Sequence, residues 1–255
     1  MLRTGFNHSN SKKRVLLPLL LLHSIRAMST SSTKKPAALI FLHGLGDTPA
    51  GWSSLQDQLP SIEPSLSNLK YVFPPAPTIP ISINGGMTMP GWFDLYDWPV
   101  SVGIKNDEEG LKKAVGVVKE CVARLEEEGI DKSRIAIGGF SQGGAVALRA
   151  VYDDDQGTSS ATGDGGSSYA ACATLSGWLT FDKSNGVNDK VPLFWGHGSF
   201  DDKVLFDQQK YGVDKLNEMG VTNVEDSSYP VGHSSHPKEM LAFAKFLDSV
   251  LFGDE

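Results

Sequence analysis

The chain has 255 residues, of which 40% are hydrophobic and 21% are charged, and these values are typical of a globular protein with a single core. Its formal net charge of -7 at pH 7 argues against nucleic acid as a partner, because no excess of positive charge is available to neutralise phosphates. Cys121 and Cys172 are the only two cysteines and fall in a predicted helix and a predicted buried strand, so we expect neither a disulfide scaffold nor a zinc site.

The N-terminal segment differs from the rest of the chain. Residues 1–35 contain no Asp or Glu, and basic residues flank the apolar run from Val15 to Leu22, which is too short to span a bilayer. The segment fits a secretory signal, an organellar transit peptide, or sequence upstream of a true start at Met28. We therefore predict an N-terminal extension followed by one folded domain over residues 36–255. We expect the protein in the cytoplasm, or in an organelle or the secretory route if the extension is a targeting signal.

The folded part begins with a continuous apolar run over residues 37–42, which predicts a strand covered on both faces. The run ends in His43-Gly44-Leu45-Gly46-Asp47. Glycines directly after a strand let backbone N–H groups turn inward, so this loop is a candidate site for binding an oxygen atom through the backbone.

A second strand is predicted at residues 69–73, and the prolines of residues 74–77 end it, because proline cannot donate to a β ladder. Residues 81–97 follow and are rich in Met and aromatic side chains, yet Gly and Pro interrupt them, so they do not form a regular helix. This segment either covers the core as a loop or forms a pliable wall for an apolar ligand. The candidate ligand-binding side chains of the second interpretation are Met87, Met89, Trp92 and Phe93.

Apolar residues recur every three to four positions over residues 108–128 and predict an amphipathic helix. Gly129 follows where a C-cap glycine belongs. Residues 153–168 are rich in Asp, Gly, Ser and Thr, and we expect them to form a flexible surface insertion without catalytic content.

Strands and helices alternate along the rest of the chain. Further apolar strands are predicted at residues 170–175 and 191–195, and further helices at residues 205–219 and 237–251. This alternation predicts an α/β fold in which helices cover both faces of a mainly parallel central sheet.

The most informative stretch runs from Ile135 to Leu148. An apolar β-branched run stops at two glycines, a serine follows, and an Ala- and Leu-rich helical pattern begins after two more glycines. The stretch therefore predicts a strand, a sharp turn and a helix. Residues 139–143 match G-x-S-x-G, the nucleophile elbow of α/β hydrolases, which exposes a serine hydroxyl at the positive end of a helix. Taken alone, the motif fits an ordinary glycine-rich turn equally well.

A serine hydroxyl becomes a good nucleophile when an imidazole takes its proton, and the imidazole needs a carboxylate to fix its tautomer. The chain supplies an acid just after the predicted strand at residues 191–195 and then a histidine directly before the last predicted helix, where a strand end is expected, in the order that α/β hydrolases use. We therefore predict Ser141 as the nucleophile, Asp201 as the acid and His233 as the base. Asp202 is an alternative acid and His236 an alternative base.

Two other histidines receive structural roles. His43 precedes Ser141, whereas the base of this fold comes last in the chain, so we expect His43 to pack against its own loop. His197 lies in the loop of the acid, and we expect it to make hydrogen bonds there.

Five motifs together are specific: FLHGLGD at 41–47, PAP at 75–77, MPGWFD at 89–94, GGFSQGG at 138–144 and GHSS at 232–235. With them the chain, from residue 37 to the C-terminus, resembles the acyl-protein thioesterase / lysophospholipase family of small α/β hydrolases. The resemblance implies a catalytic triad of Ser141, Asp201 and His233. It also implies an oxyanion hole formed by the backbone N–H groups of Leu45 and Gln142.

The acid loop departs from the family pattern, which usually reads His-Gly-Asp-x-Asp-Pro-x-Val. Here Ser199 replaces the first acid, and Asp202 and Lys203 replace a proline and an apolar residue. The triad acid stays at Asp201, while the lining of the acyl channel near Lys203 departs from that of the family.

By this resemblance we expect a serine hydrolase that removes long-chain acyl groups from S-acylated protein cysteines through an acyl-enzyme. The alternatives are a lysophospholipase or a short-chain carboxylesterase and, in a different class, a non-catalytic small-molecule receptor. The expected partners are S-acylated proteins or lysophospholipids, with transient contact to a membrane surface. We expect a monomer or weak homodimer that uses no cofactor and no metal.

Overall fold

The computed structural model describes residues 1–2, 5, 35–153, 168–182 and 187–253. Nearly all of the predicted N-terminal extension at residues 1–35 and of the predicted insertion at residues 153–168 therefore lies outside the described residues. Contacts divide the chain into two units, Met1–Thr33 and Lys34–Glu255, and the second contains every described helix and strand.

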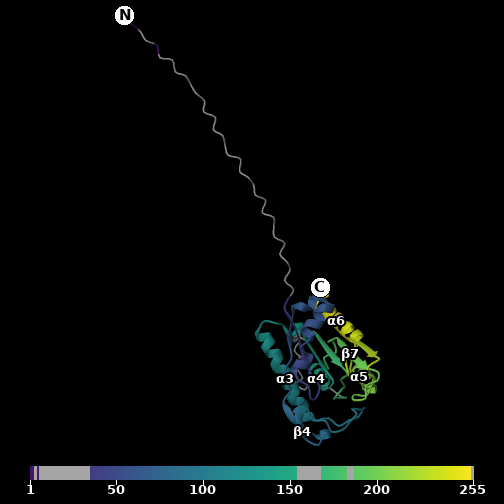
Figure 1. The fold of residues 1–255 in the computed structure, drawn as a ribbon. Coiled ribbons are helices and arrows are strands. Elements are labelled where there is room, and N and C mark those ends of the chain that lie inside the picture. The colour runs from purple at the N-terminus through teal and green to yellow at the C-terminus, as the bar shows by residue number, and fades with distance from the viewer. Residues whose placement is uncertain (3–4, 6–34, 154–167, 183–186, 254–255) are drawn as a thin grey trace. The chain divides into compact units, whose positions relative to one another are not determined.

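A parallel sheet forms the centre of the second unit (Figure 1). Each neighbouring pair of its described strands is parallel, which confirms the predicted α/β fold. The strands lie in the order β2 (Leu69–Val72), β1 (Ala37–Leu42), β5 (Ile135–Phe140), β6 (Ala171–Leu175), β7 (Leu193–Gly198) and β8 (Val224–Tyr229). Every residue of β1, β6 and β7 is buried, because helices cover the sheet on both faces.

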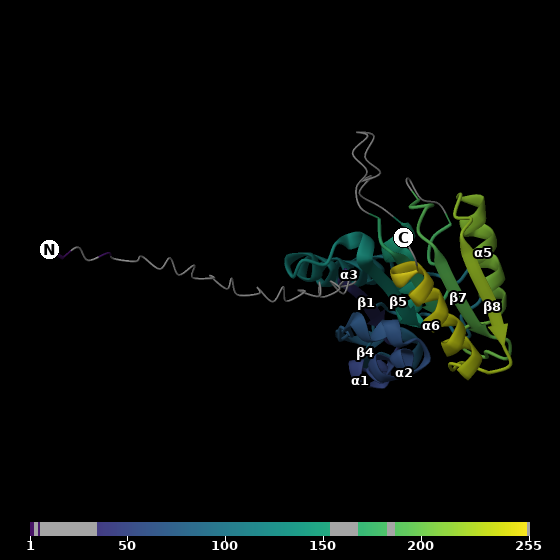
Figure 2. The ribbon, with the colours of Figure 1, turned by 90° about the horizontal axis from the view of Figure 1, so that it is seen from above.

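Two hydrophobic clusters fill the spaces between the sheet and its helices. One cluster includes Leu111 of α3 (Glu108–Glu127), Val146 of α4 (Gln142–Tyr152) and Leu216 of α5 (Asp207–Glu218). The other includes Leu59 of α2 (Leu55–Ile62) and Phe243 of α6 (Pro237–Phe252). A short helix, α1 (Pro49–Trp52), precedes α2, and Figure 2 shows α1, α2 and α6 together on one side of the sheet. The predicted helices are thus confirmed, and Gly129, two residues after the last residue of α3, has a φ of 87°.

The segment at residues 81–97 differs from its prediction, because it begins with a two-stranded antiparallel ribbon. The ribbon pairs β3 (Thr78–Ile81) with β4 (Met87–Pro90) and lies at one end of the unit (Figure 1). Each strand has four residues and contains a proline, so neither carries a clear two-residue alternation.

Both cysteines lie where the sequence places them, Cys121 in α3 and Cys172 in β6, as free and buried thiols. Burial raises the pKa of both thiols, which keeps them protonated. Among the helices that the structure describes, none has the length and apolar character needed to cross a membrane.

Candidate active site

The turn between β5 and α4 holds Ser141 in a strained conformation. Its φ is 54° and its ψ is -121°, a region that residues other than glycine rarely occupy. A Cβ atom on Gly139 would lie 2.3 Å from the carbonyl carbon of Gly143, so the turn accepts no larger side chain there. The sharp turn predicted from G-x-S-x-G is therefore present.

Ser141, His233 and Asp201 form a continuous hydrogen-bonded series. The Nε2 atom of His233 lies 2.9 Å from Ser141 Oγ, and its Nδ1 atom lies 2.8 Å from Asp201 Oδ2. The three residues follow β5, β8 and β7, whose carboxyl ends meet at one edge of the parallel sheet. This geometry lets the imidazole accept the hydroxyl proton while the carboxylate holds its Nδ1–H.

The carboxylate of Asp201 is buried, with 5% of the residue exposed. Burial acts to raise its pKa, but the hydrogen bond and charge of His233, together with bonds from the backbone N–H groups of Lys203 and Val204, outweigh burial and lower the pKa. Asp201 therefore stays ionised near neutral pH and favours the His233 tautomer with a proton on Nδ1.

The alternative acid and base lie in other surroundings. Asp202 is exposed, and its carboxylate lies 3.5 Å from the ammonium of Lys203. His236 is the N-cap of α6, and its Nδ1 accepts a hydrogen bond from the Lys238 N–H at 3.1 Å. Glu239 completes this capping box by accepting from the His236 N–H at 3.0 Å. The structure therefore gives His236 a structural partner in place of the serine.

His43 packs against its own loop, as predicted. It is 1% exposed, its Nδ1 lies 2.8 Å from the Gly44 carbonyl oxygen, and its Nε2 lies 3.2 Å from the Ala76 nitrogen. Both ring nitrogens therefore have backbone partners.

His197 is also structural, as predicted. It is fully buried, and its Nε2 lies 2.9 Å from the Val204 carbonyl oxygen and 3.5 Å from Asp201 Oδ2. Burial lowers the pKa of His197, so the ring is neutral and donates to the Val204 carbonyl. This bond holds the loop that carries Asp201.

The two residues predicted to supply oxyanion donors belong to two backbone segments near Ser141. Gln142 is the first residue of α4, so its N–H has no acceptor within the helix. Leu45 lies in the loop after β1, and a Cβ atom on the neighbouring Gly44 would lie 3.4 Å from Ser141 Cβ. Both backbone segments therefore approach the serine closely.

The four predicted ligand-binding residues differ in their exposure. Met87 is 65% exposed on the ribbon, and Met89 is partly buried against the core. Trp92 and Phe93 are only 2% and 1% exposed and belong to the core, which matches the alternative that this segment covers the core.

A cavity of about 340 Å³ opens beside Leu45 and is lined also by Ile83, Asn84 and Trp98. Lys203 reaches this region, since its ammonium lies 5.8 Å from the centroid of the Trp98 ring. The sequence did not single out Ile83 or Trp98. Their only signal was an apolar character that residues in a loop share with many core positions.

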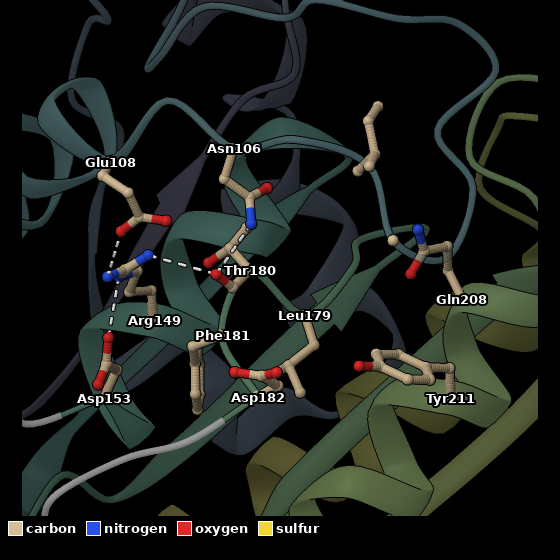
Figure 3. A pocket seen from close by; sticks show the side chains of 12 residues that line it. Asn106, Glu108, Arg149, Asp153, Leu179, Thr180, Phe181, Asp182, Gln208 and Tyr211 are labelled. Carbon is tan, nitrogen blue, oxygen red and sulfur yellow. Dashed lines mark hydrogen bonds and ion pairs between the residues drawn. The ribbon is translucent and has the colours of Figure 1, made fainter.

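A separate cavity of about 450 Å³ is lined by none of the three residues of the hydrogen-bonded series, and Figure 3 shows the side chains that line it. Arg149 borders it, but its guanidinium lies 2.7 Å from Glu108 and 3.0 Å from Asp153 and donates to the Thr180 carbonyl at 3.3 Å. With two carboxylates against one guanidinium, the cavity offers no free positive charge to an anion. In the part of the chain that the structure describes, no cluster of His, Cys, Asp or Glu forms a metal site.

Comparison with known proteins gives consistent results. The model of the family described as Phospholipase/Carboxylesterase matches residues 23–251. Acyl-protein thioesterase 1 of Debaryomyces hansenii is 35% identical to this chain over 238 residues, which cover 89% of this chain and 97% of the relative. The protein of the same name from Candida albicans is 34% identical, with the same coverage.

Solved structures agree with these relatives. The crystal structure of Arabidopsis thaliana SOBER1 superposes with a TM-score of 0.73 at 30% identity, covering 85% of this chain and 99% of that one. Zea mays acyl-protein thioesterase 2 superposes with a TM-score of 0.66 at 29% identity, covering 86% of this chain and 96% of that one.

Proposed function

This chain belongs to the phospholipase/carboxylesterase family of α/β hydrolases, and we propose that it removes long-chain acyl groups from S-acylated protein cysteines. The observation that carries the proposal is the hydrogen-bonded series from Ser141 through His233 to Asp201 at the strained turn. The thioesterase names of relatives that are nearly coextensive with this chain support the thioester as substrate.

The proposed reaction has two halves. In the first, Ser141 Oγ attacks the thioester carbonyl while His233 Nε2 takes the hydroxyl proton, and the Asp201 carboxylate stabilises the imidazolium. The N–H groups of Leu45 and Gln142 bind the negative charge that develops on the carbonyl oxygen. When the carbon–sulfur bond breaks, His233 returns the proton to the cysteine sulfur. Water then attacks the acyl-enzyme in the same manner, releasing the fatty acid and restoring Ser141.

We propose that the acyl chain enters the cavity beside Leu45, which lies next to one proposed oxyanion donor. Ile83 and Trp98 supply apolar lining, and Met87 and Met89 on the neighbouring ribbon are further candidate contacts. Each methylene that leaves water on entering would contribute about 0.8 kcal/mol. Lys203, whose ammonium lies 5.8 Å from the centroid of the Trp98 ring, would keep its charge in water.

We also propose that the enzyme meets its substrates at a membrane surface, because an S-acyl chain is held there by its own hydrophobicity. Phe200, which precedes Asp201, is 71% exposed, and Met87 is 65% exposed, so both are available to touch lipid. The proposed location is the cytoplasm, and the proposed state is a monomer or weak homodimer. Sedimentation with lipid vesicles tests the membrane contact, and light scattering after size exclusion measures the oligomeric state.

One experiment tests the activity itself. The kcat/KM of the purified enzyme is compared on a palmitoylated peptide, a lysophospholipid and a short-chain p-nitrophenyl ester. We expect the palmitoylated peptide to give the highest value. A higher value for the lysophospholipid, or for the short ester, would assign the enzyme to that substrate class, and release of no more than one equivalent from every substrate would indicate a binding protein.

A further inference from the structure

A short strap, residues 90–93, crosses from the ribbon to the turn at Ser141. On one side it holds the loop that contains Leu45. The Gly46 N–H donates to the Pro90 carbonyl oxygen at 2.7 Å, and the Trp92 indole Nε1–H donates to the His43 carbonyl oxygen at 2.8 Å. These two bonds fix the backbone on both sides of Leu45.

On its other side the strap holds Gln142. The Trp92 backbone N–H donates to Gln142 Oε1 at 2.8 Å, and Gln142 Nε2 donates to the Phe93 carbonyl oxygen at 2.6 Å. Gln142 is 1% exposed, so its side-chain amide is buried and both of its polar atoms bond to the strap. The backbone N–H of the same residue is the second proposed oxyanion donor.

The strap, the loop at residues 43–47 and the start of α4 pack closely at two glycines. A Cβ atom on Gly91 would lie 3.0 Å from Leu45 Cδ1, and one on Gly143 would lie 2.6 Å from the His43 carbonyl oxygen. In the part of the chain that the structure describes, no hydrogen bond joins the loop at 43–47 directly to residues 141–144. The strap therefore connects the two backbone segments through hydrogen bonds to each.

We propose that the side chains of Trp92 and Gln142 are positioning residues that set the distance between the two oxyanion donors. The inference rests on the proposed function, because it takes the N–H groups of Leu45 and Gln142 as those donors. An oxyanion hole works only when its donors lie within about 2.7–3.1 Å of the developing charge. The ladder between β1 and β5 pairs residues as far as Leu42 and Gly139, and beyond it the hydrogen bonds of the strap keep both donors within that range.

Trp92→Phe is the first test, because it removes the indole N–H and keeps an aromatic ring. Trp195→Phe is its matched control: Trp195 is fully buried, and among the described residues its indole N–H has no hydrogen-bond partner. We expect Trp92→Phe to lower kcat about tenfold, a part of the loss that removing a whole donor causes, and to change KM less than about twofold. Trp195→Phe should change kcat less than about twofold.

Gln142→Met is the second test, and Gln209→Met is its matched control. Gln209 is also a buried glutamine whose Nε2 donates to a backbone carbonyl, that of Trp195 at 2.7 Å. We expect Gln142→Met to lower kcat by about 10- to 100-fold, because both bonds to the strap are lost, and Gln209→Met to leave kcat within about threefold. If Gln142→Met does not fold, as judged by circular dichroism, the pair at Trp92 and Trp195 decides the matter.

A transition-state analogue separates positioning from a general loss of structure. An acyl trifluoromethyl ketone adds Ser141 Oγ to its carbonyl and leaves an oxyanion in the proposed hole. We expect its affinity for Trp92→Phe to fall by the same factor as kcat/KM. The positioning role of the strap would be contradicted by any of three results: unchanged ketone affinity, a rise in KM alone, or equal kcat losses in Trp92→Phe and Trp195→Phe. Full turnover by Ser141→Ala would instead overturn the proposed function, which keeps the two failures distinct.

Discussion

Two regions of the molecule contribute to the active site, and they are held in place differently. Ser141, Asp201 and His233 follow β5, β7 and β8 of one parallel sheet, so the backbone ladder of the sheet brings them together. Leu45 and the cavity beside it depend on residues 78–98, a ribbon and a strap outside the main sheet. Because β5 and β7 are almost entirely buried and the ribbon is partly exposed, we infer that the sheet supports the chemistry and the ribbon sets the choice of acyl chain.

The largest expected effect comes from replacing the nucleophile, which follows a strand of the central sheet. Ser141→Ala should lower kcat by roughly a millionfold, leaving the residual rate that binding and the oxyanion hole provide. Labelling by a fluorophosphonate should disappear with it. Ser234→Ala, at an exposed serine next to His233, is the control and should keep both. Stoichiometric labelling of Ser141→Ala at another serine would contradict the assignment.

The next effect distinguishes two adjacent acids. Asp201→Asn should lower kcat by roughly ten-thousand-fold, because an amide favours the wrong tautomer of His233. Asp202→Asn should change kcat less than about twofold, since Asp202 is exposed and its carboxylate faces Lys203. Steady-state kinetics at pH 8 measures both. A larger loss at Asp202 would show that the loop has a different register.

A further prediction concerns the stability of the folded state and the buried carboxylate of Glu239 in α6. Glu239 is 1% exposed, and burial raises its pKa from 4.5 to about 7. The folded state therefore binds this proton more tightly than the unfolded state does. The stability from this group is complete below pH 4.5 and is lost as the pH rises through about 7.

Glu239→Gln should remove this pH dependence, because the amide oxygen still accepts from the His236 N–H but carries no charge. We expect the variant to be more stable than the wild type by about 1–3 kcal/mol at pH 8 and by much less at pH 4.5. Urea unfolding at both pH values measures the difference. Glu225→Gln, which removes an exposed carboxylate from β8, controls for the lost charge, and an equal gain there would contradict the role of burial.

The two regions also differ in how far the sequence predicts them. The order of strands and helices is carried largely by apolar runs and helical periodicity. The placement of Ser141 and Asp201 after strands follows from that order, and that of His233 from its position directly before the last predicted helix. The ribbon carries no such signal, because its strands are short and contain prolines. β8 reads Val-Glu-Asp-Ser-Ser-Tyr and is largely exposed, so only its pairing with β7 makes it a strand.

The roles of side chains in the ribbon and the strap are harder still to predict from the sequence. An aromatic residue beside Gly and Pro suits a ligand wall and a core equally well, and burial alone places Trp92 in the core. The bonds of Gln142 to the strap join residues about fifty positions apart. Local patterns contain no information about such a contact.

The smallest expected effect concerns the ribbon and the dependence of kcat/KM on the length of the acyl chain. If an acyl chain enters the cavity beside Leu45, two extra methylenes should raise kcat/KM by about tenfold, until the cavity is filled. Trp98→Ala should weaken this dependence on chain length, because Trp98 lines the cavity. Tyr96→Ala is a matched control, since Tyr96 is also 37% exposed but lines a different cavity beside α3. The measurement is kcat/KM over a series of acyl esters, each below its critical micelle concentration. If both variants lose the dependence equally, the cavity beside Leu45 does not select the acyl chain. If kcat/KM peaks at acetate or butyrate in the wild type, the enzyme is a short-chain carboxylesterase with the same chemistry at Ser141.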